Sequence, residues 1–326
     1  MEWSWRQILA AVLLGWLLPR IMAGIGLQQA LPEATQPADS QIPAVTAPAE
    51  PEKVYLPVET AGGVLQIMEL EEYVLGVVLA EMPASFEAEA LKAQAVVART
   101  YALQRYRLGD RHASSAVCTD SGCCQAYVTR QNYLQNIGTE ADWEKVASAV
   151  ADTCGMVLTY GGQLAESTYF SCSGGRTEDA VAVWGNDYPY LQAVDSPGEE
   201  QASGYRTTVY FSAWEFVSCL GRQLQGTPES WLGKATYTDG GGVQTVYIGG
   251  LQYTGIEVRR LLKLNSTAFT FAADANGITV TTRGRGHRVG MSQYGADAMA
   301  ATGKNFEAIL AHYYPGTVID NYGDLG

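Results

Sequence analysis

Residues 70–106 constrain the fold more than any other part of this chain, because they read as two helices with a break between them. Apolar residues recur at helical spacing over about 70–79, which predicts the first helix. Pro83 cannot continue this helix, since proline lacks an N–H and clashes with the preceding turn. Ser85 suits the N-cap of the second helix, whose small apolar residues form a packing face. We therefore expect a corner between two helices, with Glu81 at the break.

The acid at this corner is the candidate catalytic residue. Glu81 would lie at the C-terminal end of the first helix, where the helix dipole is negative and raises a carboxyl pKa, as burial also does. A raised pKa is what a general acid needs at neutral pH. Lys92 and Arg99 project from nearly the same line of the second helix. These two side chains either hold polar groups of a substrate or form an ordinary surface, with their aliphatic stems buried and their charged ends in solvent. If they lie close to Glu81, their positive charges would oppose the rise in its pKa.

The N-terminal residues predict that the folded part lies outside the cytoplasm. Residues 1–25 contain an apolar run at 8–18, which is short for a membrane span and typical of a signal peptide. No clear cleavage site follows this run, so we favour a single uncleaved membrane anchor over a cleaved signal. Residues 26–52 are rich in proline and alanine and predict a tether. Residues 53–326 would then form the folded domain.

The rest of the chain alternates short helices with β-hairpins, which predicts a mixed α+β fold. We expect a main body with an inserted lobe at about 200–282 and a substrate cleft between them. Within the lobe, Thr254 and Glu257 form a capping box before a helix, and the pair at 276–277 is an Asn-Gly hairpin turn.

The chain is acidic, with 34 Asp and Glu residues against 21 Lys and Arg residues. This excess argues against nucleic acid or an anionic membrane surface as the main partner. We therefore expect no nucleic-acid partner, and membrane contact only through the N-terminal segment.

One histidine and two cysteines at regular spacing are candidate metal ligands. His112, Cys118 and Cys124 follow one another at intervals of six residues. Disulfides are the alternative in an exported protein. A histidine with two thiolates is a three-ligand zinc set that leaves the fourth position open. The pairing state of the other cysteines stays open, namely that of Cys123, Cys154, Cys172 and Cys219.

Two later polar blocks supply candidate substrate contacts. The block SCSGG suggests a serine nucleophile, but no base and orienting acid can be placed beside it. The Gly-rich loop at 284–287 lacks the lysine of a phosphate-binding loop, and its backbone would instead let a polymer approach closely. The candidate substrate-binding residues of these blocks are Ser173, His287, Ser292, Gln293 and Tyr294.

Four blocks of the chain resemble the stage II sporulation protein D family. The stretch EEYVLGVVLAEMPASFEAEALKAQAVVARTYAL looks like the family's signature. The blocks SGGRTED…VWG…PYLQAVDSP, GHRVGMSQYGADAMA and HYYPGT resemble its later motifs and follow in the family's order. Two departures are the arginines at 285 and 288, where the family often has Gly-His-Gly after an aromatic residue, and Cys172, where threonine is common.

The resemblance implies a membrane-anchored lytic transglycosylase that cleaves peptidoglycan glycan strands during forespore engulfment. Glu81 maps to the family's catalytic glutamate, and Lys92 and Arg99 map to the basic residues of the following helix. Some members hold zinc with one histidine and two cysteines at the spacing seen here. We favour a structuring role for this zinc, because an ion on Glu81 would lower its pKa. The implied partners are a sporulation amidase and a membrane scaffold protein, and the implied location is the cell membrane, with the domain between the mother-cell and forespore membranes.

A lytic transglycosylase needs only one carboxylic acid. Glu81 would protonate the oxygen between N-acetylmuramic acid and N-acetylglucosamine, and would then take the proton of the C6 hydroxyl as a 1,6-anhydro ring closes. Two alternatives remain. A wall-binding module that stimulates an amidase would need no catalytic acid, and a hydrolase would need a second carboxylate, which is not evident in the motif.

Overall fold

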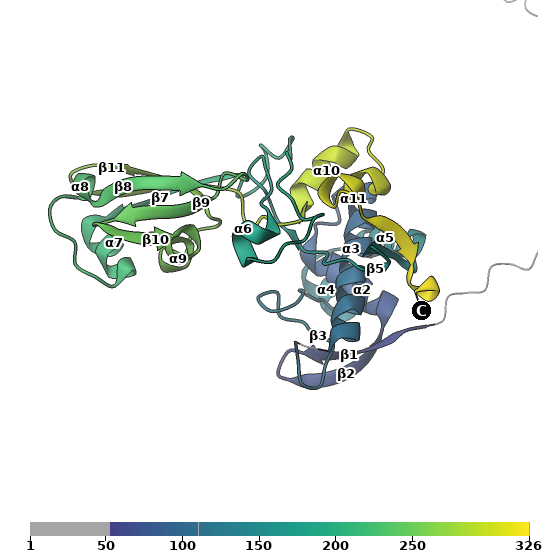
Figure 1. Cartoon of the computed structure of the whole chain (residues 1–326). Coiled ribbons are helices and arrows are strands. Elements are labelled where there is room, and N and C mark those ends of the chain that lie inside the picture. The colour runs from purple at the N-terminus through teal and green to yellow at the C-terminus, as the bar shows by residue number, and fades with distance from the viewer. Residues whose placement is uncertain (1–52, 110, 326) are drawn as a thin grey trace, which may run out of the picture. The chain divides into compact units, whose positions relative to one another are not determined.

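The computed structural model describes residues 53–109 and 111–325. The expected anchor at 1–25 and tether at 26–52 lie outside the described residues. Within the described part, helices alternate with short strands that form five small sheets (Figure 1). This arrangement confirms the expected mixed α+β class. No helix in the described part is both long and apolar enough to cross a membrane.

The larger of two hydrophobic cores combines early and late segments of the chain. Its helices are α2 (Leu70–Glu81), α3 (Ala88–Leu108), α4 (Arg130–Asn136), α5 (Glu140–Asp152), α6 (Ala180–Trp184), α10 (Gln293–Ala301) and α11 (Phe306–Tyr313). The strands around it are β1 (Tyr55–Thr60), β2 (Val64–Glu69), β3 (Val117–Cys118), β4 (Met156–Tyr160), β5 (Gln163–Leu164), β6 (Tyr169–Phe170), β13 (Met291–Ser292) and β14 (Val318–Asn321). They form sheets in the orders β2-β1-β3, β14-β4-β5 and β13-β6, so the C-terminal strands pair with much earlier ones.

The two helices expected from the sequence form the centre of this core. Helix α3 contacts α2, α5, α10, α11 and β4, because its many alanine and valine residues let these neighbours approach closely. The expected N-cap was wrong: Glu87 is the N-cap of α3, because a turn from Pro83 to Phe86 delays the start of the helix. The Glu87 N–H donates to the Asp297 carboxylate of α10 at 2.7 Å. The corner between α2 and α3 is thus held from outside as well as by its own turn.

The second, smaller core lies entirely within the middle of the chain, between residues 211 and 280. We call its elements the second-core region (residues 206–283). They are β7 (Arg206–Ser212), α7 (Ala213–Leu220), α8 (Pro228–Trp231), β8 (Leu232–Tyr237), β9 (Val243–Ile248), β10 (Leu251–Thr254), α9 (Gly255–Leu261), β11 (Ala268–Ala273) and β12 (Gly277–Arg283). The sheets run β11-β12-β7 and β10-β9-β8, and the expected capping box opens α9. The assignment of this region as a lobe facing a substrate cleft stays a prediction.

A buried ion pair connects the second-core region to the larger core. The Arg288 guanidinium lies 3.2 Å from the Glu178 carboxylate, and both side chains are almost fully buried. Arg288 also donates to the Gly240 carbonyl at 2.7 Å, and Glu178 accepts the N–H of Gly242 at 2.8 Å. Both partners therefore hold the turn between β8 and β9. One of the two arginine departures in the Gly-rich block thus has a structural role.

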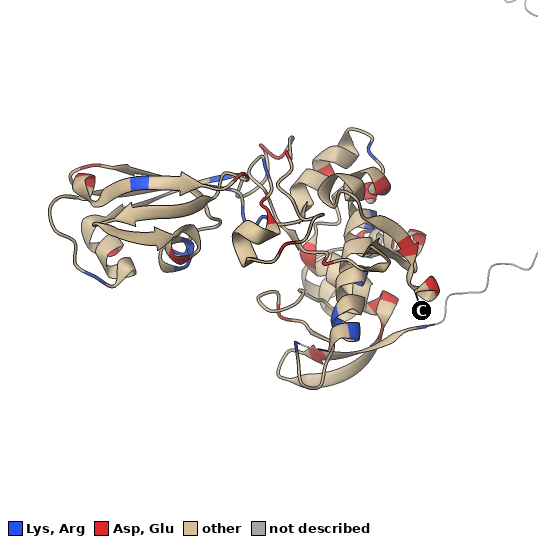
Figure 2. Ribbon diagram, in the orientation of Figure 1, with Lys and Arg blue, Asp and Glu red and all other residues tan. Residues whose placement is uncertain are grey.

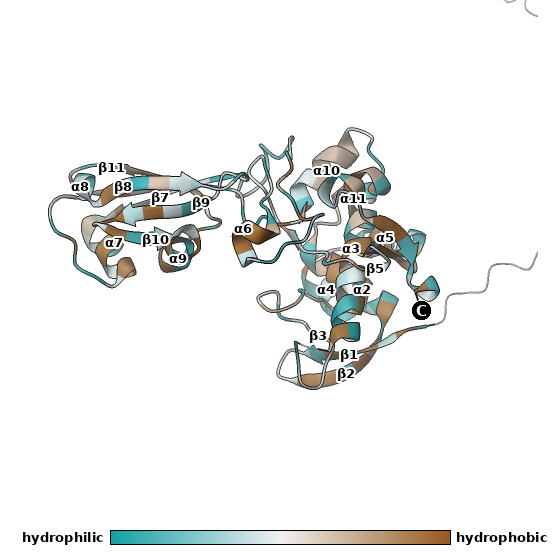
Figure 3. Cartoon of the chain, viewed as in Figure 1, coloured by the Kyte–Doolittle hydropathy of each residue, from teal (hydrophilic) through white to brown (hydrophobic). Residues whose placement is uncertain are grey.

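Exposed apolar residues gather on the hairpin of β1 and β2. Val64, Leu65 and Ile67 are 53%, 49% and 67% exposed. Figure 3 shows brown, hydrophobic stretches on this hairpin, while Figure 2 shows acidic and basic residues interspersed over the described chain. Strand β2 is an edge strand of its sheet, so it presents an apolar edge to its surroundings.

Candidate active site

A glycine in α2 allows the segment at 124–128 to lie directly against the helix. A Cβ atom on Gly76 would come within 2.2 Å of the Tyr127 ring and 2.8 Å of the Val128 carbonyl oxygen. The Val128 N–H donates to the Gly76 carbonyl at 3.1 Å. This close approach places the backbone N–H of Ala126 at the C-terminal end of α2.

Replacing Gly76 with alanine is expected to push this segment away from α2. Overpacking of this kind costs about 1–3 kcal/mol in the free energy of unfolding, measurable by denaturant titration. The pKa of Glu81 should also rise, since the hydrogen bond from Ala126 would be lost, and carboxyl NMR would report this change. Ala80→Gly in the same helix is the control, because it lowers helix propensity by about 1 kcal/mol without a clash. A Gly76→Ala protein with wild-type stability and an unchanged Glu81 pKa would contradict the packing argument.

Glu81 is half-buried at the end of α2 and lines a cavity of about 900 Å³. Its carboxylate accepts the Ala126 N–H at 2.7 Å. Burial is the main influence on the pKa of Glu81 and raises it, while hydrogen bonding from Ala126 and from the side chains of Tyr169 and Gln293 partly lowers it. The net direction of the pKa shift is upward, which the sequence had left undecided because Lys92 and Arg99 could have opposed the rise. The carboxyl can therefore stay protonated at a higher pH than an exposed glutamate, which suits a general acid.

The cavity walls combine aromatic rings with arginines. The aromatic lining residues are Tyr101, Tyr169, Phe170, Trp184 and Tyr188, and the arginines are Arg105, Arg111 and Arg285. The His287 ring lies between Phe170 and Trp184, with centroids 5.6 and 5.1 Å away. Burial lowers the pKa of His287 to about 4, and its Nδ1 accepts the Val289 N–H, so the ring is neutral near pH 7. Flat rings with polar edges suit the faces of sugar rings.

A second carboxylate also lines the cavity among the described residues, but it has a cationic partner. Arg105 donates from one nitrogen to both oxygens of Glu166, at 2.6 Å to Oε1. Both side chains are largely buried. A carboxylate held in this way serves as a counter-ion for the guanidinium, which leaves Glu81 as the lining acid with a raised pKa.

Lys92 and Arg99, the two basic residues of α3 that the sequence analysis singled out, do not line the cavity. Arg99 is fully buried, and its guanidinium donates to both oxygens of Glu71 and, at 3.0 Å, to the Met156 carbonyl. Lys92 pairs with Glu89 and Asp152 at 3.0 and 3.1 Å. These contacts tie α3 to its neighbours and give both residues structural roles, while the substrate contacts expected from the sequence stay a prediction. The seven-residue spacing of Lys92 and Arg99 predicted that they share one face of α3, but it could not predict what that face contacts.

The structural role of Arg99 predicts that Glu71→Ala and Lys92→Ala differ strongly in their free energy of unfolding. Glu71→Ala would leave a buried guanidinium unpaired, which costs about 3–5 kcal/mol in the free energy of unfolding. Lys92→Ala removes a partly exposed pair and should cost less than about 1 kcal/mol. Urea unfolding of both proteins measures the two costs. Equal stability of the two variants would show that Arg99 is not held by Glu71.

The remaining candidate substrate contacts divide into two groups. Gln293 lines the cavity beside Glu81, as His287 does nearby. Ser173 and Ser292 are fully buried: the first donates to Glu199 at 2.9 Å, and the second is the N-cap of α10. Tyr294 packs its edge on Phe86, with centroids 5.0 Å apart, and Ser173, Ser292 and Tyr294 lie outside the cavity lining.

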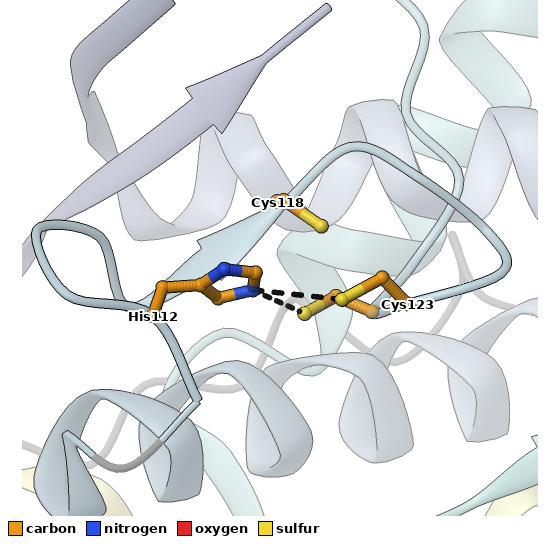
Figure 4. A group of neighbouring side chains, drawn as sticks. His112, Cys118 and Cys123 are labelled. Atoms are coloured by element: carbon orange, nitrogen blue, oxygen red, sulfur yellow. Dashed lines mark hydrogen bonds between the residues drawn. The ribbon is translucent and has the colours of Figure 1, made fainter. Parts of the chain in front are cut away.

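The cysteine-rich loop forms a cluster of four possible metal ligands. One donor atom from each of His112, Cys118, Cys123 and Cys124 lies within 4.8 Å of the others. The Nε2 atom of His112 is 3.2 Å from the Cys124 sulfur and 3.7 Å from the Cys123 sulfur (Figure 4). In a tetrahedral zinc site with Zn–S bonds of about 2.3 Å, ligand atoms lie roughly 3.8 Å apart, so this cluster fits such an ion.

A fourth possible ligand, Cys123, corrects the expectation of an open coordination position. The N–H groups of Cys123 and Cys124 both donate to the Asp120 carbonyl, and this tight turn directs both thiols toward His112. Cys123 therefore stands where an open position was expected, as in structural sites with four protein ligands. All six cysteines of the chain are free thiols, so the alternative of disulfides is also excluded in this structure.

Apart from Gln293, the sequence did not point to the residues that surround Glu81. Ala126 contributes only its backbone N–H, and Gln125 and Tyr169 come from two separate segments. The one available signal was position: Gln125 and Ala126 directly follow the cysteine pair, and Tyr169 lies two residues before the first serine of the SCSGG block.

Comparison with known proteins identifies relatives of this chain. A family model described as "Stage II sporulation protein" matches residues 59–160. The chain is 42% identical to "Stage II sporulation protein D" of Bacillus subtilis, over 88% of this chain and 83% of the relative. It is 40% identical to the protein of the same name from Bacillus amyloliquefaciens, over 77% and 74%. It is 28% identical to "Amidase enhancer" of Bacillus subtilis, over 76% of this chain but only 40% of that protein.

Proposed function

Because this chain belongs to the stage II sporulation protein D family, we propose that it is a peptidoglycan lytic transglycosylase that acts in forespore engulfment. It would cleave the bond between N-acetylmuramic acid and N-acetylglucosamine and leave 1,6-anhydro ends. The observation that carries the proposal is the state of the two lining acids. Glu81 has a pKa raised by burial, while Glu166 is occupied by Arg105. A site with one available carboxylic acid favours the lytic transglycosylase mechanism, which needs only one, over hydrolysis, which needs two.

In this reaction Glu81 acts twice. The protonated carboxyl donates its proton to the glycosidic oxygen as that bond breaks, and the sugar ring carries the developing positive charge. The resulting carboxylate, which accepts the Ala126 N–H, takes the proton from the C6 hydroxyl as the C6 oxygen bonds to C1. Glu81 ends protonated as it began, and no water is consumed. The aromatic walls with Trp184 and Tyr188 would support the sugar rings.

We propose zinc for the four-ligand cluster, with a structural role. The donors are three thiols and one imidazole, a set typical of structural zinc. The ion would hold the loop whose next residues are Gln125 and Ala126. It would thereby support the backbone N–H that contacts Glu81, without taking part in the reaction.

We propose the setting by resemblance to the family. The domain would be anchored by residues 1–25 in the cell membrane and would act between the mother-cell and forespore membranes. A sporulation amidase and a membrane scaffold protein would be its protein partners. The relative named "Amidase enhancer" supports a second candidate function, a wall-binding module that stimulates an amidase.

Product analysis separates these functions. The purified chain and its Glu81→Gln variant would each be incubated with isolated glycan strands, and the products would be identified by mass spectrometry. We expect 1,6-anhydro ends from the wild type only. Reducing ends would indicate hydrolysis, and no cleavage by the wild type, together with stimulation of an added amidase, would favour the binding module.

A further inference from the structure

A chain of hydrogen bonds leads from the interior of α2 to Tyr169, which lines the same cavity as the carboxyl at the end of this helix. The Tyr73 hydroxyl donates to the Gln125 amide oxygen at 3.2 Å, and the Gln125 amide nitrogen donates to the Tyr169 hydroxyl at 3.1 Å. Tyr169 and Glu81 line the same cavity, and the Tyr169 side chain partly lowers the pKa of the Glu81 carboxyl, as a hydrogen-bond donor would. Tyr73 and Glu81 belong to the same helix, while Gln125 and Tyr169 come from separate segments that meet at the cavity.

The direction of the donors follows from the number of protons that each group carries. Because the oxygen of the Gln125 amide accepts from Tyr73, its NH₂ group faces Tyr169. The oxygen of Tyr169 is thus an acceptor toward Gln125, and its single proton remains for another partner. The Glu81 carboxyl, which lines the same cavity and whose pKa Tyr169 partly lowers, is available to accept this proton.

Burial makes this arrangement difficult to rearrange. Tyr73 and Gln125 are 0% and 1% exposed. A buried polar group that loses its hydrogen bond costs about 1–3 kcal/mol, so each member holds the next in one orientation. The Tyr73 ring is also stacked on Tyr127, with centroids 5.8 Å apart, which fixes the first donor.

We propose that Tyr169 and Gln125 are positioning residues for the reaction: the Tyr169 hydroxyl orients the Glu81 carboxyl for proton transfer, and Gln125 holds that hydroxyl in place. This inference rests on the proposed function, because it assigns a task to a reacting acid. The Ala126 N–H and Tyr169 together fix the plane of the carboxyl. They also favour the carboxylate that must form when the first proton leaves, so the acid can both release its proton and recover one.

Tyr169→Phe tests this inference, since it removes the hydroxyl and keeps the ring. We expect kcat on glycan strands to fall about 10–100-fold with little change in KM, because the carboxyl would lose its orientation. The alkaline limb of the pH profile should move to higher pH, since a donor to the carboxylate would be lost. Tyr106→Phe, on an exposed part of α3, is the control and should behave as wild type. A Tyr169→Phe enzyme with the wild-type kcat and pH profile would overturn the proposal.

The role of Gln125 requires a double variant. Gln125→Met keeps the side-chain volume without hydrogen bonds, and its kcat should fall less than that of Tyr169→Phe. The double variant should be no slower than Tyr169→Phe alone, because Gln125 acts through Tyr169. If the two losses multiply instead, Gln125 does not act through the tyrosine. Metal analysis of each protein checks that the neighbouring cysteine cluster is intact.

An NMR titration separates this inference from the proposed function. The pKa of Glu81 should be higher in Tyr169→Phe than in wild type, whether or not glycan is cleaved. An unchanged pKa would refute the contact between Tyr169 and Glu81 even in an active enzyme. A raised pKa in a protein that forms no anhydro ends would instead refute the proposed function and leave the contact standing.

Discussion

Glu81→Gln is expected to lower kcat for glycan cleavage by about 10³-fold or more. General acid–base catalysis contributes roughly 10²–10⁴-fold for one proton transfer, and here the same group performs two. Glutamine keeps the size of the side chain and can still contact the Ala126 N–H through its carbonyl oxygen. Glycan binding should therefore persist while cleavage is lost. Steady-state kinetics and a pull-down with glycan strands measure the two properties separately.

Glu81→Gln is also expected to change the stability of the protein in a pH-dependent way. Burial raises the pKa of Glu81 above that of the unfolded chain, so its contribution to stability is complete below the unfolded pKa and is lost as the pH rises through the folded pKa. Glu81→Gln should therefore melt at a higher temperature than wild type at pH 8, and the difference should shrink toward pH 4. Glu144→Gln, on an exposed face of α5, is the control and should change neither rate nor melting temperature. Residual activity of Glu81→Gln within tenfold of wild type would rule out the single-acid mechanism.

Loss of the metal cluster is the second large effect that we expect. Removing a structural metal typically costs more than most single substitutions, and we expect about 3–5 kcal/mol here. For a domain of this size that loss corresponds to a fall of about 10 °C in melting temperature. Cleavage should be lost with it, because the residues that hold Glu81 directly follow Cys124. Differential scanning calorimetry before and after chelation, and again after zinc is restored, measures the effect.

Substitution of single cysteines tests whether the cluster has four ligands. Cys123→Ser should weaken zinc binding about as much as Cys118→Ser, because both thiols belong to the set. Cys219→Ser, in α7 of the second-core region, is the control and should bind zinc as wild type does. Unchanged zinc affinity in Cys123→Ser would restore the three-ligand interpretation. Purified protein without stoichiometric metal would refute the site itself.

Residues from three distant segments of the folded chain influence the pKa of Glu81. Ala126, Tyr169 and Gln293 are separated from it by tens to hundreds of residues, and all three influence its pKa. No local pattern relates such positions, because hydrophobic periodicity describes one helix or strand at a time. The comparison with relatives places the chain in its family, yet the contacts that adjust this acid are visible only in the fold.

Arg99 illustrates the same limit. Its spacing from Lys92 correctly predicted one line along α3, but this line faces Glu71 and Asp152 and not the cavity. The cysteine pair was equally ambiguous, since only the turn at Asp120 decides that both thiols point to His112.

The sequence by itself determined the two central helices, the acid at their break, the mixed fold class and three of the four cluster residues. These features depend on helix periodicity, on proline and on short spacings, all of which act over a few neighbouring residues. The tertiary structure alone decided which side chains contact Glu81, that Arg99 is buried and that Cys123 completes the cluster. Those outcomes depend on packing between distant segments, where burial and hydrogen bonding set the energy of each polar group.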